Sequence, residues 1–144
     1  MFLFDEIDFV RTQGMPISQL WYFLPIGYLV TILIETPILF LGLSPKISLK
    51  QKLWCGVWLT ACTYPIVIIV LPAIFLEHSR TLYLVVAETF APLVECLLFW
   101  LAFRGKDMLG TSAWVRCFIA IVIANLASFG IGEILNLFSW FGLF

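Results

Sequence analysis

Four long apolar runs restrict what this chain can fold into. A helix needs about 20 predominantly apolar residues to cross the roughly 30 Å hydrocarbon core of a bilayer. The runs that meet this length are 21–43, 53–75, 82–103 and 117–140. Because the connections between them are short, neighbouring helices should pack antiparallel. We therefore predict a single all-α domain, an integral membrane bundle of four transmembrane helices.

The overall composition supports a membrane protein. Hydrophobic residues make up 62% of the chain and charged residues 12%, with a mean hydropathy of +1.07. A soluble domain has about 25% charged residues. The net charge of −1 provides no basic field, which argues against nucleic acid as a partner. The lipid bilayer is thus the first expected partner.

The distribution of positive charge predicts the orientation of the bundle. Six Lys and Arg residues fall in the first and third connections, namely Lys46, Lys50, Lys52, Arg104, Lys106 and Arg116. The other two are Arg11 and Arg80. Because cytoplasmic loops carry an excess of Lys and Arg, both of these connections should face the cytoplasm and both termini the outer side.

The first twenty residues do not resemble a cleaved signal peptide. They carry Asp5, Glu6 and Asp8 where a signal peptide carries positive charge. Leu3 and Ile7 fall on one helical face, so the segment 1–20 is predicted to be either a short helix at the membrane interface or an acidic tail.

Four glutamates interrupt the apolar runs, and their presence needs a reason. Glu35, Glu88, Glu95 and Glu133 lie in stretches that contain no Lys, Arg or His. A charged side chain at the bilayer centre costs about 2.5–3.5 kcal/mol on insertion scales. Intramembrane acids therefore indicate either a functional site or a set of neutral carboxyls that hold helices together.

The depth of the polar residues suggests that several of them meet. Glu35 and Glu95 each lie eight residues from the predicted cytoplasmic end of their helix, as does Asn125, and Thr63 and Cys62 fall near the same level. A second level, nearer the outer side, contains Glu88 and Glu133. We expect an interior column of carboxyl groups.

A stripe of small residues on the last helix predicts close helix packing. Ala124, Ser128 and Gly132 recur every four residues, and such stripes let helix backbones approach. Asn125 and Glu133 flank the stripe, so both should turn inward.

Other chemistry finds less support. Cys62 near the Glu35 level is a weak candidate for a soft-metal ligand, and a bound metal cation remains open, but no cofactor is predicted. Fingerprints of hydrolases, P-loop proteins and dinucleotide-binding proteins are not found in the sequence. We do not expect an enzyme.

Three short elements resemble a known group of proteins. They are T-Y-P at Thr63–Pro65, the pair Glu88 and Glu95 seven residues apart, and N-L-A-S at Asn125–Ser128. Together they resemble small bacterial and archaeal membrane proteins with T-x-P, E-x6-E and N-x-x-S elements, a group without a known activity. Tyr64 stands where that group usually has His or Asn. The resemblance implies the plasma (inner) membrane of a prokaryote.

Two functional hypotheses follow. In the first, a carboxyl-rich centre of Glu35, Glu88, Glu95, Asn125, Ser128, Glu133 and Thr63 binds protons or cations, in transport. In the second, the chain is a structural accessory subunit of a larger membrane complex, whose partners satisfy its acids. Either a homo-oligomer or a subunit of a complex is expected.

Overall fold

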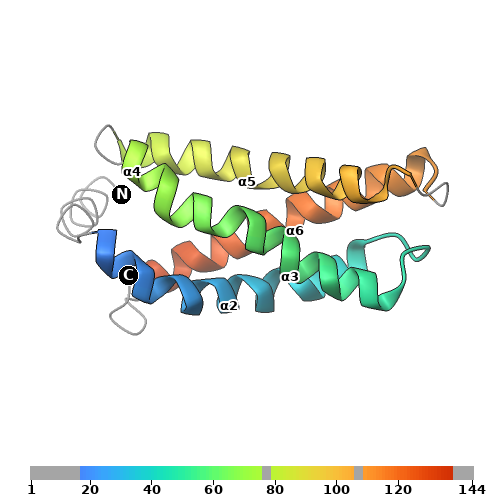
Figure 1. Cartoon of the computed structure of the whole chain (residues 1–144), viewed down its shortest axis with the longest axis horizontal. Coiled ribbons are helices and arrows are strands. Elements are labelled where there is room, and N and C mark those ends of the chain that lie inside the picture. The colour runs from blue at the N-terminus through green and yellow to red at the C-terminus, as the bar shows by residue number, and fades with distance from the viewer. Residues whose placement is uncertain (1–16, 76–78, 106–108, 138–144) are drawn as a thin grey trace.

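The protein is a bundle of long antiparallel helices (Figure 1). The computed structural model describes residues 17–75, 79–105 and 109–137, which contain helices and no strand. In chain order the elements are α2 (Ile17–Gly42), α3 (Leu49–Pro65), the π-helix η1 (Ile66–Val70), α4 (Leu71–Phe75), α5 (Arg80–Phe103) and α6 (Thr111–Leu137). Helices α3, η1 and α4 follow one another directly and form one transmembrane-length rod.

The predicted all-α architecture is confirmed. Four stretches of the described chain are long and apolar enough to cross a membrane, and they are Leu24–Gly42, Leu49–Phe75, Thr81–Phe103 and Thr111–Leu135. The beginning of α2 and the end of α6 lie at the same end of the bundle (Figure 1). Which end faces the cytoplasm stays a prediction. The proposed interfacial segment falls almost wholly outside the described residues.

The second rod changes its helical geometry between two prolines. Pro65 ends α3, and Pro72 lies in α4. Proline donates no backbone hydrogen bond, so the carbonyl about one turn earlier in the helix needs another partner. Ile66–Val70 between them is a π-helix, and the hydroxyl of Tyr83 on α5 donates to the carbonyl of Val67 at 3.2 Å. A side chain from the neighbouring helix thereby helps to satisfy this irregular stretch.

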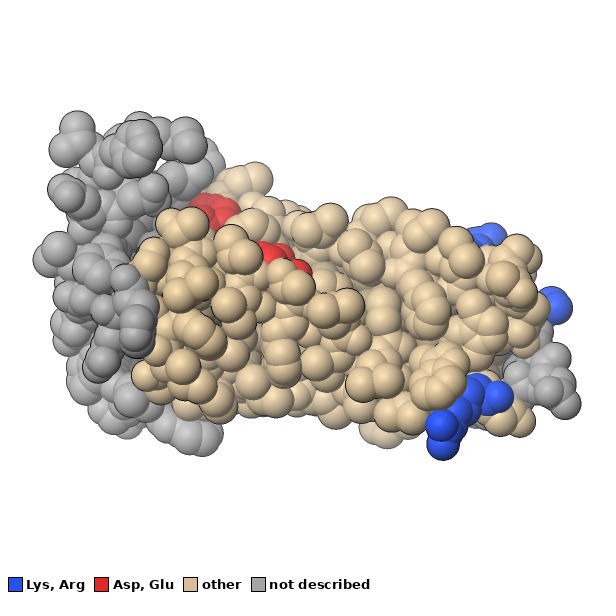
Figure 2. Space-filling model, turned by 90° about the horizontal axis from the view of Figure 1, so that it is seen from above, with Lys and Arg blue, Asp and Glu red and all other residues tan. Residues whose placement is uncertain are grey.

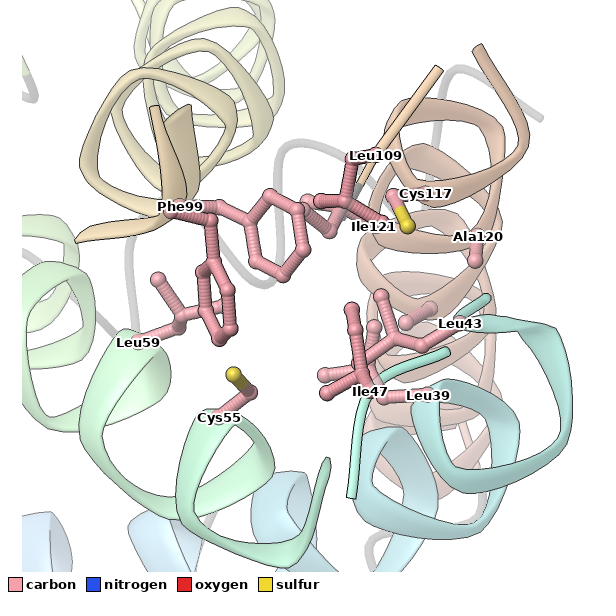
Figure 3. Close-up of a cluster of buried hydrophobic side chains, with 12 residues drawn as sticks. Leu39, Leu43, Ile47, Cys55, Leu59, Phe99, Leu109, Cys117, Ala120 and Ile121 are labelled. Carbon is pink, nitrogen blue, oxygen red and sulfur yellow. The ribbon is translucent and has the colours of Figure 1, made fainter. Parts of the chain in front are cut away.

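A cluster of buried apolar side chains fills the bundle toward its first and third connections (Figure 3). Five members are fully buried, namely Leu39 of α2, Leu43 directly after α2, Leu59 of α3, Phe99 of α5 and Ile121 of α6. The ring of Phe99 stacks on Phe103 with centroids 4.7 Å apart and meets Trp114 edge-on at 5.9 Å. These contacts hold all four spans together at this end.

Two cationic side chains close the carboxyl end of α2. The last carbonyls of a helix have no partner within that helix. Lys52 Nζ donates to the carbonyls of Phe40 and Leu43 at 3.1 and 3.0 Å. Arg116 donates through Nε to Gly42 O at 2.8 Å and through Nη2 to Leu41 O at 3.1 Å. Positive charge is favourable at a helix C-terminus, so these bonds tie α3 and α6 to the end of α2.

Glycines permit the closest helix contacts. A methyl group at Gly56 of α3 would overlap the hydroxyl of Thr36 and come within 3.0 Å of its Cα, so α2 and α3 are in near-backbone contact there. A methyl group at Gly42 would lie 2.6 Å from Cβ of Ala120 on α6. Without a hydrophobic force between helices in lipid, such close approach carries much of their association.

The small-residue stripe on α6 packs one turn away from its predicted position. Ala120 and Ala124 are buried and Ser128 is half-buried, whereas Gly132 is exposed. A methyl group at Gly132 would meet nothing within 4 Å. Within the described chain, the close contact therefore involves Ala120, Ala124 and Ser128 rather than Gly132. Ala124 and Ser128 of the predicted stripe face inward, whereas Gly132, one turn further along α6, makes no close contact.

We predict that Gly56→Ala destabilises the bundle by about 1–3 kcal/mol, the usual cost of overpacking, because the added methyl group must push α2 away. Gly132→Ala is the matched control, since it adds the same group where space is open. The control should keep or raise stability, because alanine is the better helix former by about 1 kcal/mol. Thermal unfolding of both variants in detergent measures the difference, and equal midpoints would contradict the close α2–α3 contact.

Candidate functional site: a buried pair of carboxyl groups

The first carboxyl, Glu35 on α2, is only 2% exposed and is held by two hydroxyl groups. Its Oε2 lies 2.7 Å from Thr60 Oγ1 on α3, and its Oε1 lies 2.7 Å from Ser128 Oγ on α6. Both carboxyl oxygens thus have a partner, each from a different neighbouring helix. Such pairing is required because a buried polar group without a partner is costly.

The second carboxyl, Glu95 on α5, is 1% exposed and repeats this arrangement. Its Oε1 lies 2.7 Å from Thr63 Oγ1 on α3. The side-chain amide of Asn125 on α6 donates to its Oε2 at 2.8 Å. Each glutamate therefore binds one group from α3 and one from α6, although the two acids sit on different helices.

Helical spacing explains why the same two helices serve both acids. Thr60 and Thr63 are three residues apart, as are Asn125 and Ser128, and residues at this spacing share a helix face. The inward face of α3 thus presents two hydroxyls, and that of α6 presents an amide and a hydroxyl. We call Glu35 and Glu95 the carboxyl pair. Together with these four side chains, the pair forms the polar centre of the bundle.

Each hydroxyl in the centre also lies near a carbonyl of its own helix. Thr60 Oγ1 is 3.0 Å from Gly56 O, and Thr63 Oγ1 is 3.2 Å from Leu59 O, both one turn earlier on α3. Ser128 Oγ is 2.9 Å from Asn125 O. A hydroxyl has a single proton to donate. Every one of these side chains is therefore placed between two acceptor oxygens and can donate to only one of them.

The other two glutamates lie toward the end of the bundle opposite the Lys and Arg cluster, which consists of Lys46, Lys50, Lys52, Arg104 and Arg116 (Figure 2). Glu88 on α5 and Glu133 on α6 are only partly buried. Glu88 is near enough to both Glu133 and Glu35 to interact with them electrostatically, and Glu35 interacts in the same way with Glu95. Figure 2 shows acidic atoms reaching the surface in this half of the molecule. The four carboxyls thus form an electrostatically connected series from a partly exposed position to the buried pair.

The structure brings together most of the predicted polar residues. Glu35, Glu95, Thr63, Asn125 and Ser128 are all hydrogen-bonded within the centre. Glu88 and Glu133 lie beside it rather than in it. Thr60 is the partner that sequence reasoning missed, and its three-residue spacing from Thr63 was the available signal.

Cys62, the weak metal candidate, lies away from the centre. Its side chain is exposed, whereas its neighbour Thr63 faces inward. Within residues 17–75, 79–105 and 109–137, no group of three or more His, Cys, Asp or Glu is arranged to hold a metal ion. The oxygens of the carboxyl pair are instead directed at hydroxyl and amide groups.

Comparison of the chain with protein-family models, curated proteins and solved structures finds no match. The site is therefore interpreted from its own geometry.

We predict that Thr63→Val lowers stability, because it leaves Oε1 of buried Glu95 without its partner. Interhelical hydrogen bonds in membranes contribute about 0.6 kcal/mol on average, with a maximum of about 1.7. Thr89→Val is the matched control, since the Thr89 hydroxyl is exposed and bonds only to Val85 O of its own helix at 2.7 Å. Denaturant unfolding in detergent should show the loss in Thr63→Val alone, and equal losses would contradict the bond to Glu95.

Proposed function

We propose that this chain is a small membrane protein that binds protons on its buried carboxyl pair and acts in proton transport. The observation that carries the proposal is the position of each hydroxyl partner between a carboxyl oxygen and a backbone carbonyl. The number of available donor protons then determines how many of these contacts can be hydrogen bonds.

The number of donor protons is easiest to compare with the number of contacts at Glu95. Four close contacts surround it. Glu95 contacts Thr63 and Asn125, and each of these two side chains also contacts a backbone carbonyl of its own helix. The Asn125 amide has two protons and can serve both its acceptors, but the Thr63 hydroxyl has one. With Glu95 ionised, one contact lacks a proton. With Glu95 protonated, the carboxyl donates to Thr63, Thr63 donates to Leu59 O, and all four contacts are hydrogen bonds.

The same reasoning applies to Glu35. Thr60 and Ser128 together have two protons for four contacts, two to the carboxyl and two to backbone carbonyls. A proton on Glu35 provides a third hydrogen bond. Protonation also removes the repulsion between two carboxylates that interact in a medium of low dielectric constant. The hydrogen-bond argument favours a bound proton at each site, and the repulsion argument favours at least one proton on the pair.

A proton suits these oxygens better than a larger cation does. A metal ion coordinated by oxygen keeps its ligands at about 2.0–2.6 Å and needs six or more of them in the hard-cation sites of proteins. Each oxygen of the carboxyl pair already has a hydroxyl or amide partner at 2.7–2.8 Å. A metal would have to displace these partners, whereas a proton fits between the existing atoms.

Transport requires exchange with water, and Glu88 offers a route. Intramembrane acids in series are a feature of proton relays in pumps and transporters. Glu88 interacts with partly buried Glu133 on one side and with Glu35 on the other. We propose that protons reach the buried pair through these two residues, from the end opposite the Lys and Arg cluster.

We predict that infrared spectra of the protein in lipid contain a protonated carboxylic acid band that weakens in Glu95→Gln and in Glu35→Gln. Glutamine is nearly isosteric and its amide can donate to Thr63 or Thr60 in place of the acid proton, so both variants should fold. Ser128→Ala is the control, because it alters the surroundings of Glu35 without removing a carboxyl. A band that is the same in the wild type and both glutamine variants would contradict protonation.

Proton flux into liposomes containing the purified protein tests transport separately. We expect the wild type to dissipate a pH gradient faster than empty liposomes and Glu95→Gln to abolish the excess. The Thr89→Val variant should retain it. Wild-type flux equal to that of empty liposomes would refute transport, even if the infrared band established the bound protons.

An accessory subunit of a larger membrane complex is the alternative, and the exposed apolar surface of the bundle is compatible with it. Large apolar side chains are exposed on every span, with Leu33 at 72%, Trp54 at 65% and Leu93 at 64%. A protein partner could cover such surface as well as lipid can. If this alternative holds, gentle extraction from the native membrane should yield a fixed complex with unrelated chains. Recovery of the free chain or of multiples of 16.4 kDa would count against it.

A further inference from the structure

A groove on the outer face of α6 is distinct from the carboxyl pair. It is shallow and widely open to the surroundings, with a volume of about 420 Å³. Its lining comes mainly from one face of α6, at Ser112, Val115, Arg116, Ile119 and Ile123. Gly42 at the end of α2 and Ala120 also line it, where the two helices are in close contact. Two small residues at the crossing thus leave room that bulkier side chains would fill.

The two ends of the groove differ in chemistry. Ser112 and Arg116 are the polar lining residues and lie at the start of α6, at the end of the bundle where Lys46, Lys50, Lys52 and Arg104 also lie. Figure 2 shows these cations gathered at one end of the molecule. Val115, Ile119 and Ile123 are all about half exposed and continue the groove toward the middle of the span. The groove therefore changes from cationic to apolar along the direction in which a lipid lies.

Arg116 retains donors for a ligand. Nε and one N–H of Nη2 bond to carbonyls of α2, which fixes the guanidinium plane. A guanidinium has five N–H groups, so three remain. None of these three bonds to another residue of the described chain. A guanidinium held in this way matches the geometry of a phosphate group, which arginine recognises through paired donors.

We propose that this groove binds a phospholipid with an anionic headgroup. The phosphate contacts Arg116 and the hydroxyl of Ser112, and one acyl chain lies along Val115, Ile119 and Ile123. From Arg116 to Ile123 the helix rises by about 10 Å, so the apolar part of the groove covers the upper portion of an acyl chain. The lipid would also cover the exposed edge of the contact between α2 and α6.

A second copy of the chain is a less suitable occupant. The described carboxylates are Glu35, Glu88, Glu95 and Glu133, which lie in the interior or toward the opposite end from Arg116. Two copies inserted in the same orientation would offer no described carboxylate at the depth of Arg116. An anionic lipid places its negative charge at the headgroup level, where the cations of this end also lie. Charge complementarity with Arg116 thus favours the lipid over the described part of a second copy.

Native mass spectrometry of the full chain, supplied with phosphatidylglycerol or phosphatidylcholine of identical acyl chains, tests the proposal. We expect the wild type to retain phosphatidylglycerol preferentially. Arg116→Gln should reduce this preference by about fivefold, the effect expected for one basic residue at a membrane surface. Lys50→Gln is the matched control, because it removes the same charge from the same end but outside the groove, and it should keep the preference.

A second variant guards against misfolding of Arg116→Gln, which also loses its bonds to α2. Ser112→Asp places a negative charge in the first turn of α6, where it is favourable for the helix but repels a phosphate. It should keep the fold and lose the preference.

Equal losses in Arg116→Gln and Lys50→Gln would overturn the site in favour of diffuse attraction. A dimer that Arg116→Gln dissociates would show a second copy in the groove instead. Because Glu95→Gln leaves the groove unchanged, it should bind the lipid like the wild type whether or not the protein carries protons.

Discussion

The need to satisfy buried carboxyl groups without water shapes this protein more than any other interaction. Glu35 and Glu95 lie almost fully buried among apolar helices, where an unpaired polar group is strongly unfavourable. Each is satisfied only because α3 and α6 approach from two sides with a hydroxyl or an amide. The polar centre therefore requires all four spans at once, and the relative rotation of the helices is restricted to arrangements that keep these contacts.

Close backbone packing and the polar centre depend on one another. The Thr60 hydroxyl reaches Glu35 from α3, and Gly56 lies one turn earlier on that helix against Thr36, the neighbour of Glu35. The absence of a side chain at Gly56 brings the two helices near enough for a 2.7 Å contact between Thr60 and Glu35. In return, the hydrogen bonds hold helices that have little hydrophobic reason to associate in lipid. Fold stability and the chemistry of the site thus rest on the same few residues.

The bundle is polarised along its length, and the two proposals use opposite ends. Lys46, Lys50, Lys52, Arg104 and Arg116 lie in or beside the first and third connections, where Lys52 and Arg116 satisfy the final carbonyls of α2. The acids begin in the interior and extend toward the other end through Glu88 and Glu133. An apolar cluster around Phe99 separates the cationic end from the carboxyl pair. The carboxyl pair thus lies away from the cations, which would favour ionised carboxylates, and this supports the proposed protonation.

The sequence by itself determined the number and approximate limits of the spans, because length and hydropathy are sufficient to define a helix in lipid. It also determined that Glu35, Glu95, Asn125 and Thr63 lie at similar depth. The depth of a residue along a helix does not tell which way its side chain faces. Only the tertiary structure therefore decided that Thr60 completes the polar centre, that Cys62 faces outward and that Gly132 makes no close contact. Those outcomes depend on where neighbouring helices cross, which is set by the volumes of side chains on both partners and is not encoded in the spacing of either helix alone.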